Sequence, residues 1–238
     1  MTAKIRLYVE QPLGAAQAVA LTRDQAHYLF SVMRLDIGAR VAIFNGRDGE
    51  WQAAVVEAGK RGGILLCHEQ SQPQNTPPNL WLLFAPIKKA RTDFIVEKAA
   101  ELGVRRILPV QTAHTNSDRI RQDRLQAHAI EAAEQCGTTF VPEVVGLQRL
   151  DKVLDSWGER RLAFCDEALV GTTHRFEQVP GPWAILIGPE GGFSDAERVR
   201  LRAADFTTPI SLGPRILRAD TAAVAAITLW QSTLGDWA

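Results

Sequence analysis

The sequence has few of the residues that mark secreted, metal-binding or membrane-spanning proteins. Its 238 residues include three cysteines, Cys67, Cys136 and Cys165, an odd number and too widely spaced for a disulfide framework or a zinc site. The five histidines show no metal-ligand spacing. No apolar run reaches the roughly 18 residues that span a membrane, and the N-terminus lacks a secretory signal pattern. We therefore expect a cytoplasmic protein with no metal and no membrane partner.

An excess of charge of either sign is also missing. Lysines and arginines number 27, as do aspartates and glutamates, which argues against a protein that coats nucleic acid through bulk positive charge. Between residues 85 and 125, however, nine basic residues outnumber five acidic ones. This cluster suits phosphate binding and a solvated helix face with paired charges equally well.

The composition is that of an ordinary globular protein, with 46% apolar and 23% charged residues. The sequence pattern, however, changes near residue 75. Residues 71–79 contain three prolines and no large apolar side chain, which predicts a linker between two domains. Residues 1–70 show short strand-like runs separated by glycine turns, with one helix that starts at a capping box of Thr22 and Gln25. This pattern predicts a small β-barrel.

Residues 80–238 alternate apolar strands with helical segments, which predicts an α/β domain with a parallel sheet covered on both faces. The predicted strands lie at 81–84, 107–110, 162–164, 184–187 and 210–212, and the predicted helices lie near 91–102, 119–136, 194–204 and 220–234. Gly103 and Gly137 stand where a left-handed residue would end a helix. Ser194 and Glu197 form a second capping box.

Two loops leave the carboxyl ends of predicted strands, where open parallel sheets bind ligands. The first, GPEGGF, follows Ile187. It matches neither the phosphate-cradling loop nor the dinucleotide fingerprint, which argues against a polyphosphate and against a nucleotide-dependent dehydrogenase. Its glycines allow a ligand to approach the backbone closely, and adenine with a ribose is the favoured candidate.

The second loop, SLGPRILRADTAA, places Arg215 and Arg218 three residues apart beside an apolar stretch. Two fixed guanidiniums suit a developing oxyanion or a phosphate. The alternative is that both arginines are solvated or paired loop charges, and that Asp220 or Thr221 is the N-cap of the next helix.

The motifs ILIGPEGGFSDAE and LGPRILRADTAAVAA closely resemble the 16S ribosomal RNA (uracil-N3) methyltransferase family, a branch of the knotted SPOUT superfamily. HYLFSVMRLDIGARVAIFNG resembles the PUA-like N-terminal domain of that family, and DFIVEKAAELGVRRILPVQT and EAAEQCGTTFVPEV resemble its next elements. The resemblance covers nearly the whole chain. It implies an RNA-binding PUA-like β-barrel over 1–70, a linker over 71–79, and a SPOUT methyltransferase domain with a deep trefoil knot over 80–238.

The resemblance also implies a methyl donor and partners. The donor is S-adenosylmethionine (SAM), with S-adenosylhomocysteine as the product, and the partners are the 16S rRNA of the 30S subunit and a second copy of the chain in a homodimer. The residues expected to bind the cofactor lie in the two loops: Ile187, Gly188, Glu190, Gly191, Leu212, Gly213, Ile216, Leu217 and Thr221.

Methylation at uracil N3 requires that the N3 proton leaves, and the resulting anion spreads onto O2 and O4. Cationic donors stabilise such an anion, so we expect Arg218 or Arg215 in this role, with Asp220 or Glu190 as proton acceptor. The target base must be unpaired or flipped out of its helix. The residues expected to hold the RNA backbone are basic: Arg6, Arg34, Arg40, Lys88, Lys89 and Arg91.

Three residues depart from the family pattern. Asp220 stands where glutamate is common, and Thr138 and Thr115 stand where arginines are usual, so those two arginine roles are not transferred. Two other functions are compatible with the sequence. One is a knotted methyltransferase that acts on another base or on a ribose 2′-hydroxyl, and the other is a non-catalytic ribosome assembly factor that binds no cofactor.

Overall fold

The structure is a computed structural model that describes residues 5–117, 119–171, 176 and 178–238. The chain divides into two compact units. The N-terminal unit contains the residues up to 76 together with 133–141, and the C-terminal unit contains 77–132 together with 142–238. The division after residue 76 falls inside the segment predicted as a linker, but no sequence pattern indicated that 133–141 group with the N-terminal residues.

The N-terminal unit is built on a five-stranded sheet with the order β1-β3-β4-β5-β2. Its elements are β1 (Arg6–Tyr8), β2 (Ala18–Ala20), α1 (Arg23–Ala26), the π-helix η1 (His27–Val32), β3 (Arg40–Phe44), β4 (Glu50–Gly59) and β5 (Gly62–Gln72). The β1–β3 pair is parallel and the other pairs are antiparallel. Among the described residues no ladder joins β1 to β2, so these strands are the two edges.

The core of this unit forms where the strands and the helical turn meet. Val9, Leu29, Val41 and Leu65 are fully or almost fully buried there. The predicted capping box is confirmed, because the Thr22 hydroxyl accepts the Gln25 N–H at 3.3 Å and Gln25 Oε1 accepts the Thr22 N–H at 2.9 Å. Strand β2 was not predicted because only the central one of its three residues is buried, which is too short a pattern to recognise.

The C-terminal unit confirms the predicted α/β class. Its strands are β6 (Leu80–Phe84), β7 (Arg106–Gln111), β8 (Glu143–Val144), β9 (Gln148–Arg149), β10 (Arg161–Cys165), β11 (Trp183–Ile187) and β12 (Thr207–Ile210). Its helices are α2 (Lys89–Glu101), α3 (Gln122–Cys136), α4 (Leu150–Asp155), the short 3-10 helix η2 (Glu167–Leu169), α5 (Asp195–Ala203) and α6 (Ala219–Leu234). The end of α3, from residue 133, groups with the N-terminal unit. All strand pairs are parallel, with the order β12-β10-β11-β6-β7-β8 and with β9 beside β7.

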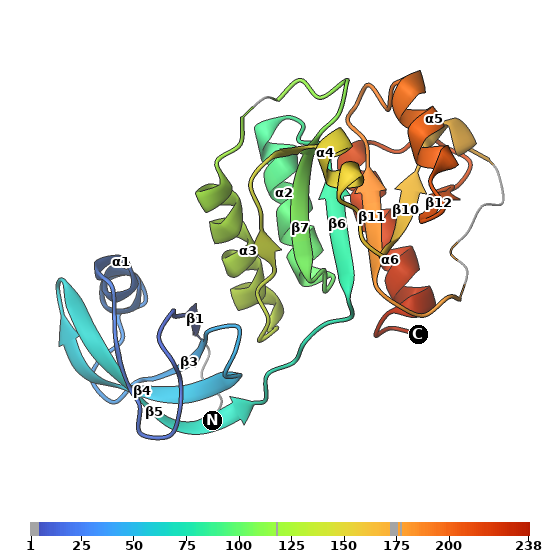
Figure 1. Ribbon diagram of the computed structural model, residues 1–238. Coiled ribbons are helices and arrows are strands. Elements are labelled where there is room, and N and C mark those ends of the chain that lie inside the picture. The colour runs from blue at the N-terminus through green and yellow to red at the C-terminus, as the bar shows by residue number, and fades with distance from the viewer. Residues whose placement is uncertain (1–4, 118, 172–175, 177) are drawn as a thin grey trace. The chain divides into compact units, whose positions relative to one another are not determined.

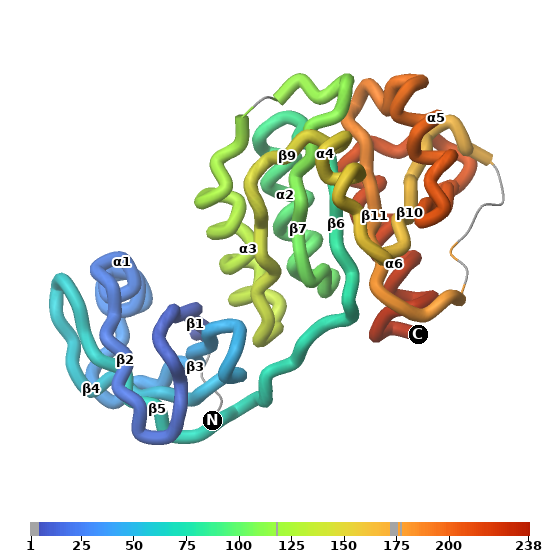
Figure 2. Tube along the Cα trace, in the orientation of Figure 1, coloured from blue at the N-terminus to red at the C-terminus, as the bar shows by residue number. Residues whose placement is uncertain are grey.

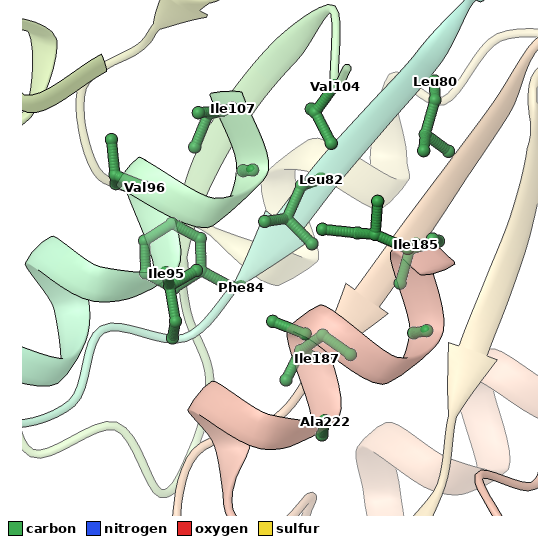
Figure 3. Packing of buried hydrophobic residues seen from close by; sticks show 14 of the residues in the cluster. Leu80, Leu82, Phe84, Ile95, Val96, Val104, Ile107, Ile185, Ile187 and Ala222 are labelled. Carbon is green, nitrogen blue, oxygen red and sulfur yellow. The ribbon is translucent and has the colours of Figure 1, made fainter. Parts of the chain in front are cut away.

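Alternate residues of the central strands point to opposite faces of this sheet, and each face is covered by helices (Figure 1). Leu82, Phe84 and Ile185 belong to one buried cluster with α2, α3 and α6, and Figure 3 shows these side chains together with Ile95 of α2. Leu83 and Leu186 belong to the second cluster, with α4 and α5. The near-continuous apolar strands are therefore explained by burial on both faces.

Several boundaries differ from the sequence-based prediction. The strand predicted at 210–212 lies at Thr207–Ile210, because β12 pairs with β10 and β10 ends at Cys165, opposite Ile210. Helix α3 begins at Gln122 rather than at 119, and the six-residue α4 was missed because it is too short to show a helical period. Gly103 and Gly137 have φ of 74° and 83°, which confirms both helix ends.

Within the described ranges, none of the helices combines the length and the apolar character that crossing a membrane requires.

Candidate active site

Three loops meet at the carboxyl ends of β10, β11 and β12, which are close together because β10 lies between the other two. Figure 2 follows the chain along β10 and β11 and on into α5. A cavity of about 420 Å³ lies at this edge of the sheet. Its floor is formed by the last residues of the strands, Cys165, Ile187 and Ile210. Its position follows the rule for ligand sites in open parallel sheets.

Most of the residues predicted to bind a cofactor line this cavity. They are Ile187, Gly188, Glu190, Leu212, Gly213, Ile216 and Leu217. Gly191 and Thr221 are not among the lining residues. The Gly191 carbonyl oxygen lies 3.0 Å from His114 Nδ1, on the side of the loop that follows β7, and Thr221 is exposed in the first turn of α6.

The sequence reasoning missed the third wall of the cavity. The loop after β10 contributes Asp166, Glu167 and Val170, and the residues before α2 and in its first turn contribute Lys88 and Arg91. The carboxyl-end rule also indicates this loop when it is applied to the predicted strand at 162–164. The loop lacks the Gly-Pro start that makes the other two distinctive.

Two glycines of the first loop are required by their surroundings. A Cβ at Gly188 would lie 2.7 Å from a ring carbon of Phe193, which is buried edge-on against Phe164 at a centroid distance of 4.9 Å. Gly192 has φ of 66°, and a Cβ there would overlap the Glu167 carboxylate. The loop therefore packs tightly beneath the cavity and leaves its backbone open to a ligand.

Hydrogen bonds fix the exit of this loop into α5. The Ser194 hydroxyl accepts the Glu197 N–H at 3.3 Å, and Glu197 Oε2 accepts the Ser194 N–H at 2.9 Å, which confirms the second predicted capping box. Glu197 Oε1 also accepts the Ala113 N–H at 2.8 Å. One side chain thus joins α5, the glycine loop and the loop after β7.

A buried ionic network supports the loop after β10. The side chain of Asp166 is fully buried and accepts hydrogen bonds from Arg198 Nε at 3.2 Å, from Arg202 Nη2 and from the Ala168 N–H at 3.0 Å. Burial raises the pKa of Asp166, but the bonds from Ala168, Arg202 and Arg198 together outweigh it, so its pKa lies below the ordinary value. Burial raises the pKa of the neighbouring Cys165 to about 12, so this thiol is a neutral part of the wall.

The two arginines of the second loop both line the cavity and are exposed. Neither makes an ion pair with any residue in the described part of the chain. Arg218 itself is the N-cap of α6 without a side-chain cap bond, so the alternative with Asp220 or Thr221 as N-cap is wrong. The helix begins at Ala219, which places Asp220 in the first turn, where its carboxylate lies 3.3 Å from Arg91 Nη1.

The residues predicted to hold RNA fall into two groups. Arg34 and Arg40 are exposed on the N-terminal unit, and Lys88, Lys89 and Arg91 lie at the start of α2 in the C-terminal unit.

Arg6 has a different environment from these five residues. It is 16% exposed, and its guanidinium donates to Glu50 Oε2 at 2.6 Å and to the carbonyl oxygens of Ala133, Glu134 and Thr138 at 2.6 to 2.9 Å. These bonds lie within the N-terminal unit and use four of the five N–H donors of the side chain, so we do not include Arg6 in the RNA-binding proposal.

The basic cluster between residues 85 and 125 is partly paired. Arg124 contacts Asp93 at 2.9 Å and Lys98 contacts Glu101 at 2.6 Å, as expected for a solvated helix face, whereas Lys88 and Lys89 have no ion pair within the described ranges.

Among all the residues that the structure describes, no group of three or more His, Cys, Asp or Glu side chains is arranged to hold a metal ion.

The parallel sheet, the cavity at its carboxyl edge and the basic residues beside that cavity define an α/β enzyme domain attached to a small β-rich unit. Comparison with known proteins gives the particular family. The family model described as "RNA methyltransferase domain" matches residues 74–231, and the model described as "RNA methyltransferase PUA domain" matches residues 21–65. The chain therefore belongs to the RNA methyltransferase family.

Relatives support this assignment over nearly the full length. Ribosomal RNA small subunit methyltransferase E of Rickettsia conorii is 29% identical over 229 residues, which cover 93% of each chain. The protein of the same name from Synechocystis is 30% identical over 233 residues, which cover 93% of this chain and 75% of the relative.

Among solved structures, the Neisseria gonorrhoeae enzyme of that name bound to S-adenosyl methionine has a TM-score of 0.89 and 27% identity, and the match covers 98% of this chain and 99% of that one. A Legionella pneumophila protein solved with the bound cofactor SAM has the same TM-score and 29% identity, with 99% of this chain and 100% of that chain covered.

Proposed function

We propose that this protein transfers a methyl group from SAM to N3 of a uridine in the 16S rRNA of the 30S subunit. The observation that carries the proposal is the cavity of about 420 Å³ formed by the loops after β10, β11 and β12, in a chain that belongs to the RNA methyltransferase family. A structural relative of similar fold and length is bound to the same cofactor.

The residues of the cavity fit SAM. Ile187, Leu212 and Leu217 offer an apolar wall for the adenine, and Gly188 and Gly213 leave backbone groups accessible for hydrogen bonds. Among the carboxylates that line the cavity, that of the exposed Glu190 suits the positive sulfonium and amino groups or the ribose hydroxyls. The carboxylates of Asp166 and Glu167 are paired with Arg198 and support the loop after β10. When bound, SAM supplies an electrophilic methyl group on its sulfonium.

The acceptor base is handled by side chains on the open side of the cavity. Arg218 and Arg215 line it with their guanidiniums free of ion pairs in the described part of the chain, so their donors are available to uracil O2 and O4 as N3 loses its proton. Asp220 or Glu190 accepts that proton. Arg91, which also lines the cavity, holds the carboxylate of Asp220 at 3.3 Å.

The remaining basic residues hold the RNA backbone in this proposal. Arg34 and Arg40 act from the N-terminal unit, and Lys88, Lys89 and Arg91 act from the start of α2. The exposure of Arg34, Arg40, Lys88 and Lys89 supports this role, since phosphate contacts position an RNA without reading its sequence. Arg91 is half-buried and paired with Asp220.

We further propose a deep trefoil knot within residues 80–238, a homodimer, and a cytoplasmic location, where ribosomal subunits are found. The contact between the loops after β10 and β12 supports the knot, since the Gly171 N–H donates to the Gly213 carbonyl at 3.0 Å. Large apolar side chains that are exposed in the single chain, Ile216 and Leu229, support coverage by a second copy.

The test is to incubate unmethylated 30S particles with the protein and SAM and to identify the modified nucleosides by mass spectrometry. We expect 3-methyluridine at one site. A methyl group on a ribose or on another base would contradict the proposed acceptor. Absence of methylation together with absence of SAM binding in a calorimetric titration would instead identify a non-catalytic assembly factor.

A further inference from the structure

A second cavity, of about 430 Å³, lies at the opposite edge of the parallel sheet, beside the amino ends of β6 and β7. Its lining includes two indoles and two guanidiniums, which belong to Trp81, Trp157, Arg106 and Arg160. Because β6 has five residues, this cavity is roughly 17 Å, one strand length, from the carboxyl ends that form the cofactor cavity. It is therefore a separate site.

The two guanidiniums are gathered around one indole. The Arg160 guanidinium lies 3.8 Å from the Trp81 ring centroid and that of Arg106 lies 5.0 Å from it. Arg160 is fixed in place, because Nη1 donates to the carbonyl oxygens of Asn79 and Trp183, both at 2.9 Å. Stacking on an aromatic face leaves the edge of a guanidinium free to donate to another group.

Arg106 has donors to spare. Its Nε lies 3.0 Å from Glu143 Oε2, but its two terminal amino groups make no hydrogen bond to any residue that the structure describes. Its side chain is 35% exposed. A guanidinium that is stacked, partly buried and free along one edge is arranged to bind an oxyanion with two parallel hydrogen bonds.

The charge around the cavity favours an anion. A third guanidinium, that of Arg105, lies nearby and donates from Nε to the Pro77 carbonyl at 3.1 Å. Burial and the charges of Arg105 and Arg106 lower the pKa of Arg160 to about 10. The acidic residues here are Glu143, paired with Arg106, and the exposed Glu159, so the three cations are not fully compensated.

We propose that this cavity binds a backbone phosphate of the RNA substrate, with Arg106 as the main ligand and Arg160 in support. The proposal rests on the proposed function for the identity of the partner. The site offers one free guanidinium edge and no glycine-rich loop, which suits a single phosphodiester rather than a nucleoside polyphosphate. The half-buried indole of Trp157 gives an apolar surface for the adjoining sugar or base.

The test compares the RNA affinity of the wild type, Arg106→Gln and Arg106→Lys by fluorescence anisotropy with a labelled single-stranded segment of small-subunit rRNA. For Arg106→Gln we expect a roughly 3- to 10-fold weaker affinity and a plot of log K against log salt that is less steep by about 0.7. Arg106→Lys keeps the charge and should keep the slope. The matched control is Arg149→Gln, at an exposed arginine whose charge Asp151 already pairs at 2.6 Å, and it should change neither quantity.

Two further measurements keep the outcomes distinct. A SAM affinity that stays at the wild-type value in Arg106→Gln shows that the C-terminal unit is intact. RNA binding is measured without turnover, so it does not depend on methylation. Failure of methylation would therefore overturn the proposed function alone. An unchanged affinity and salt slope in Arg106→Gln would overturn the phosphate site. Arg106-dependent binding of uridine 5′-monophosphate with unaltered RNA binding would also overturn it, in favour of a free nucleotide.

Discussion

Arg218 is held by its backbone, and its side chain is left free. Its carbonyl accepts the Ala222 N–H at 2.7 Å as α6 begins, while its guanidinium makes no side-chain cap bond. Replacing Arg218 by alanine should therefore keep the helix and remove a cation from the cavity. We expect Arg218→Ala to lower kcat by about 100-fold or more, as loss of one oxyanion donor does, with SAM affinity near the wild-type value. Steady-state kinetics and calorimetric titration measure both quantities.

Retained turnover in Arg218→Ala would remove this residue from the mechanism. Arg218→Lys is the useful second variant, because it keeps the charge but loses the planar fork of donors. We expect its activity to lie between those of the wild type and the alanine variant.

The ionisation of Asp166 contributes to the stability of the C-terminal unit. Because its pKa is lower in the folded protein than its ordinary value of 3.8, ionised Asp166 stabilises the fold above that value, and this contribution is lost as the pH falls through the folded pKa. Asp166→Asn should therefore be less stable than the wild type near neutral pH, and the difference should shrink in acid. Urea unfolding from about pH 6 down to about pH 3 measures it.

The matched control for this experiment is Asp205→Asn, at an exposed residue of the same unit. A gap between Asp166→Asn and the wild type that persists unchanged into acid would contradict the assigned role of the ionised carboxylate.

Candidate functional residues could be predicted from the sequence where both the residue type and the surrounding loop are distinctive. The glycine loops and the two arginines beside them were found in this way, and the structure brings them to one cavity. The hydrogen-bond partners of Arg6 could not be predicted from the sequence, because those at 133–138 are far away along the chain and only folding brings them together.

At the scale of elements, the two capping boxes offer a matched pair. Ser194 caps α5 directly after the glycine loop of the cavity, and Thr22 caps α1 in the N-terminal unit. Replacing either by alanine removes the cap bond that its hydroxyl accepts, which costs about 1 kcal/mol in the free energy of unfolding of its unit. Ser194→Ala also removes the bond that the hydroxyl donates to Glu197 Oε2 at 2.9 Å. Only Ser194→Ala should also weaken SAM binding, because only that cap follows a loop that lines the proposed cofactor cavity. Chemical denaturation and calorimetric titration of both variants measure this, and equal SAM affinities would contradict it.

The helices and strands show which local sequence signals are sufficient to predict an element. Long apolar strands, glycine helix ends and capping boxes act within a few residues, and each was predicted and confirmed. The end of β12 depends on where its neighbour β10 stops, so local sequence does not determine it. Helix α4 has only six residues, which are too few to show a helical period.

For the whole molecule, the change of sequence pattern near residue 75 predicted a division between two domains. The grouping of 133–141 with the N-terminal unit could not be predicted from the sequence. That grouping depends on hydrogen bonds such as the one from the Asn75 N–H to the Thr139 hydroxyl at 2.9 Å, between residues that no sequence period relates. The resemblance to a family supplied what the physical patterns could not, which is the methyl donor and the acceptor.

The proposed homodimer leads to a prediction for the whole molecule. Sedimentation equilibrium should give twice the chain mass of 26.2 kDa. Because Leu229 is 43% exposed on α6, Leu229→Glu would place a charge in an interface that covers this helix, and we expect it to shift the equilibrium toward monomer. The exposed Val199→Glu on α5 serves as the control. A wild type that sediments as a single chain would contradict the dimer.

A crystal structure of the protein grown with SAM tests the proposed cofactor site directly. We expect the adenine against Ile187, Leu212 and Leu217, between the loops that follow β10, β11 and β12, with the methyl-bearing sulfur toward Arg218. SAM bound elsewhere on the molecule, or those loops filled by side chains of the protein itself, would contradict it.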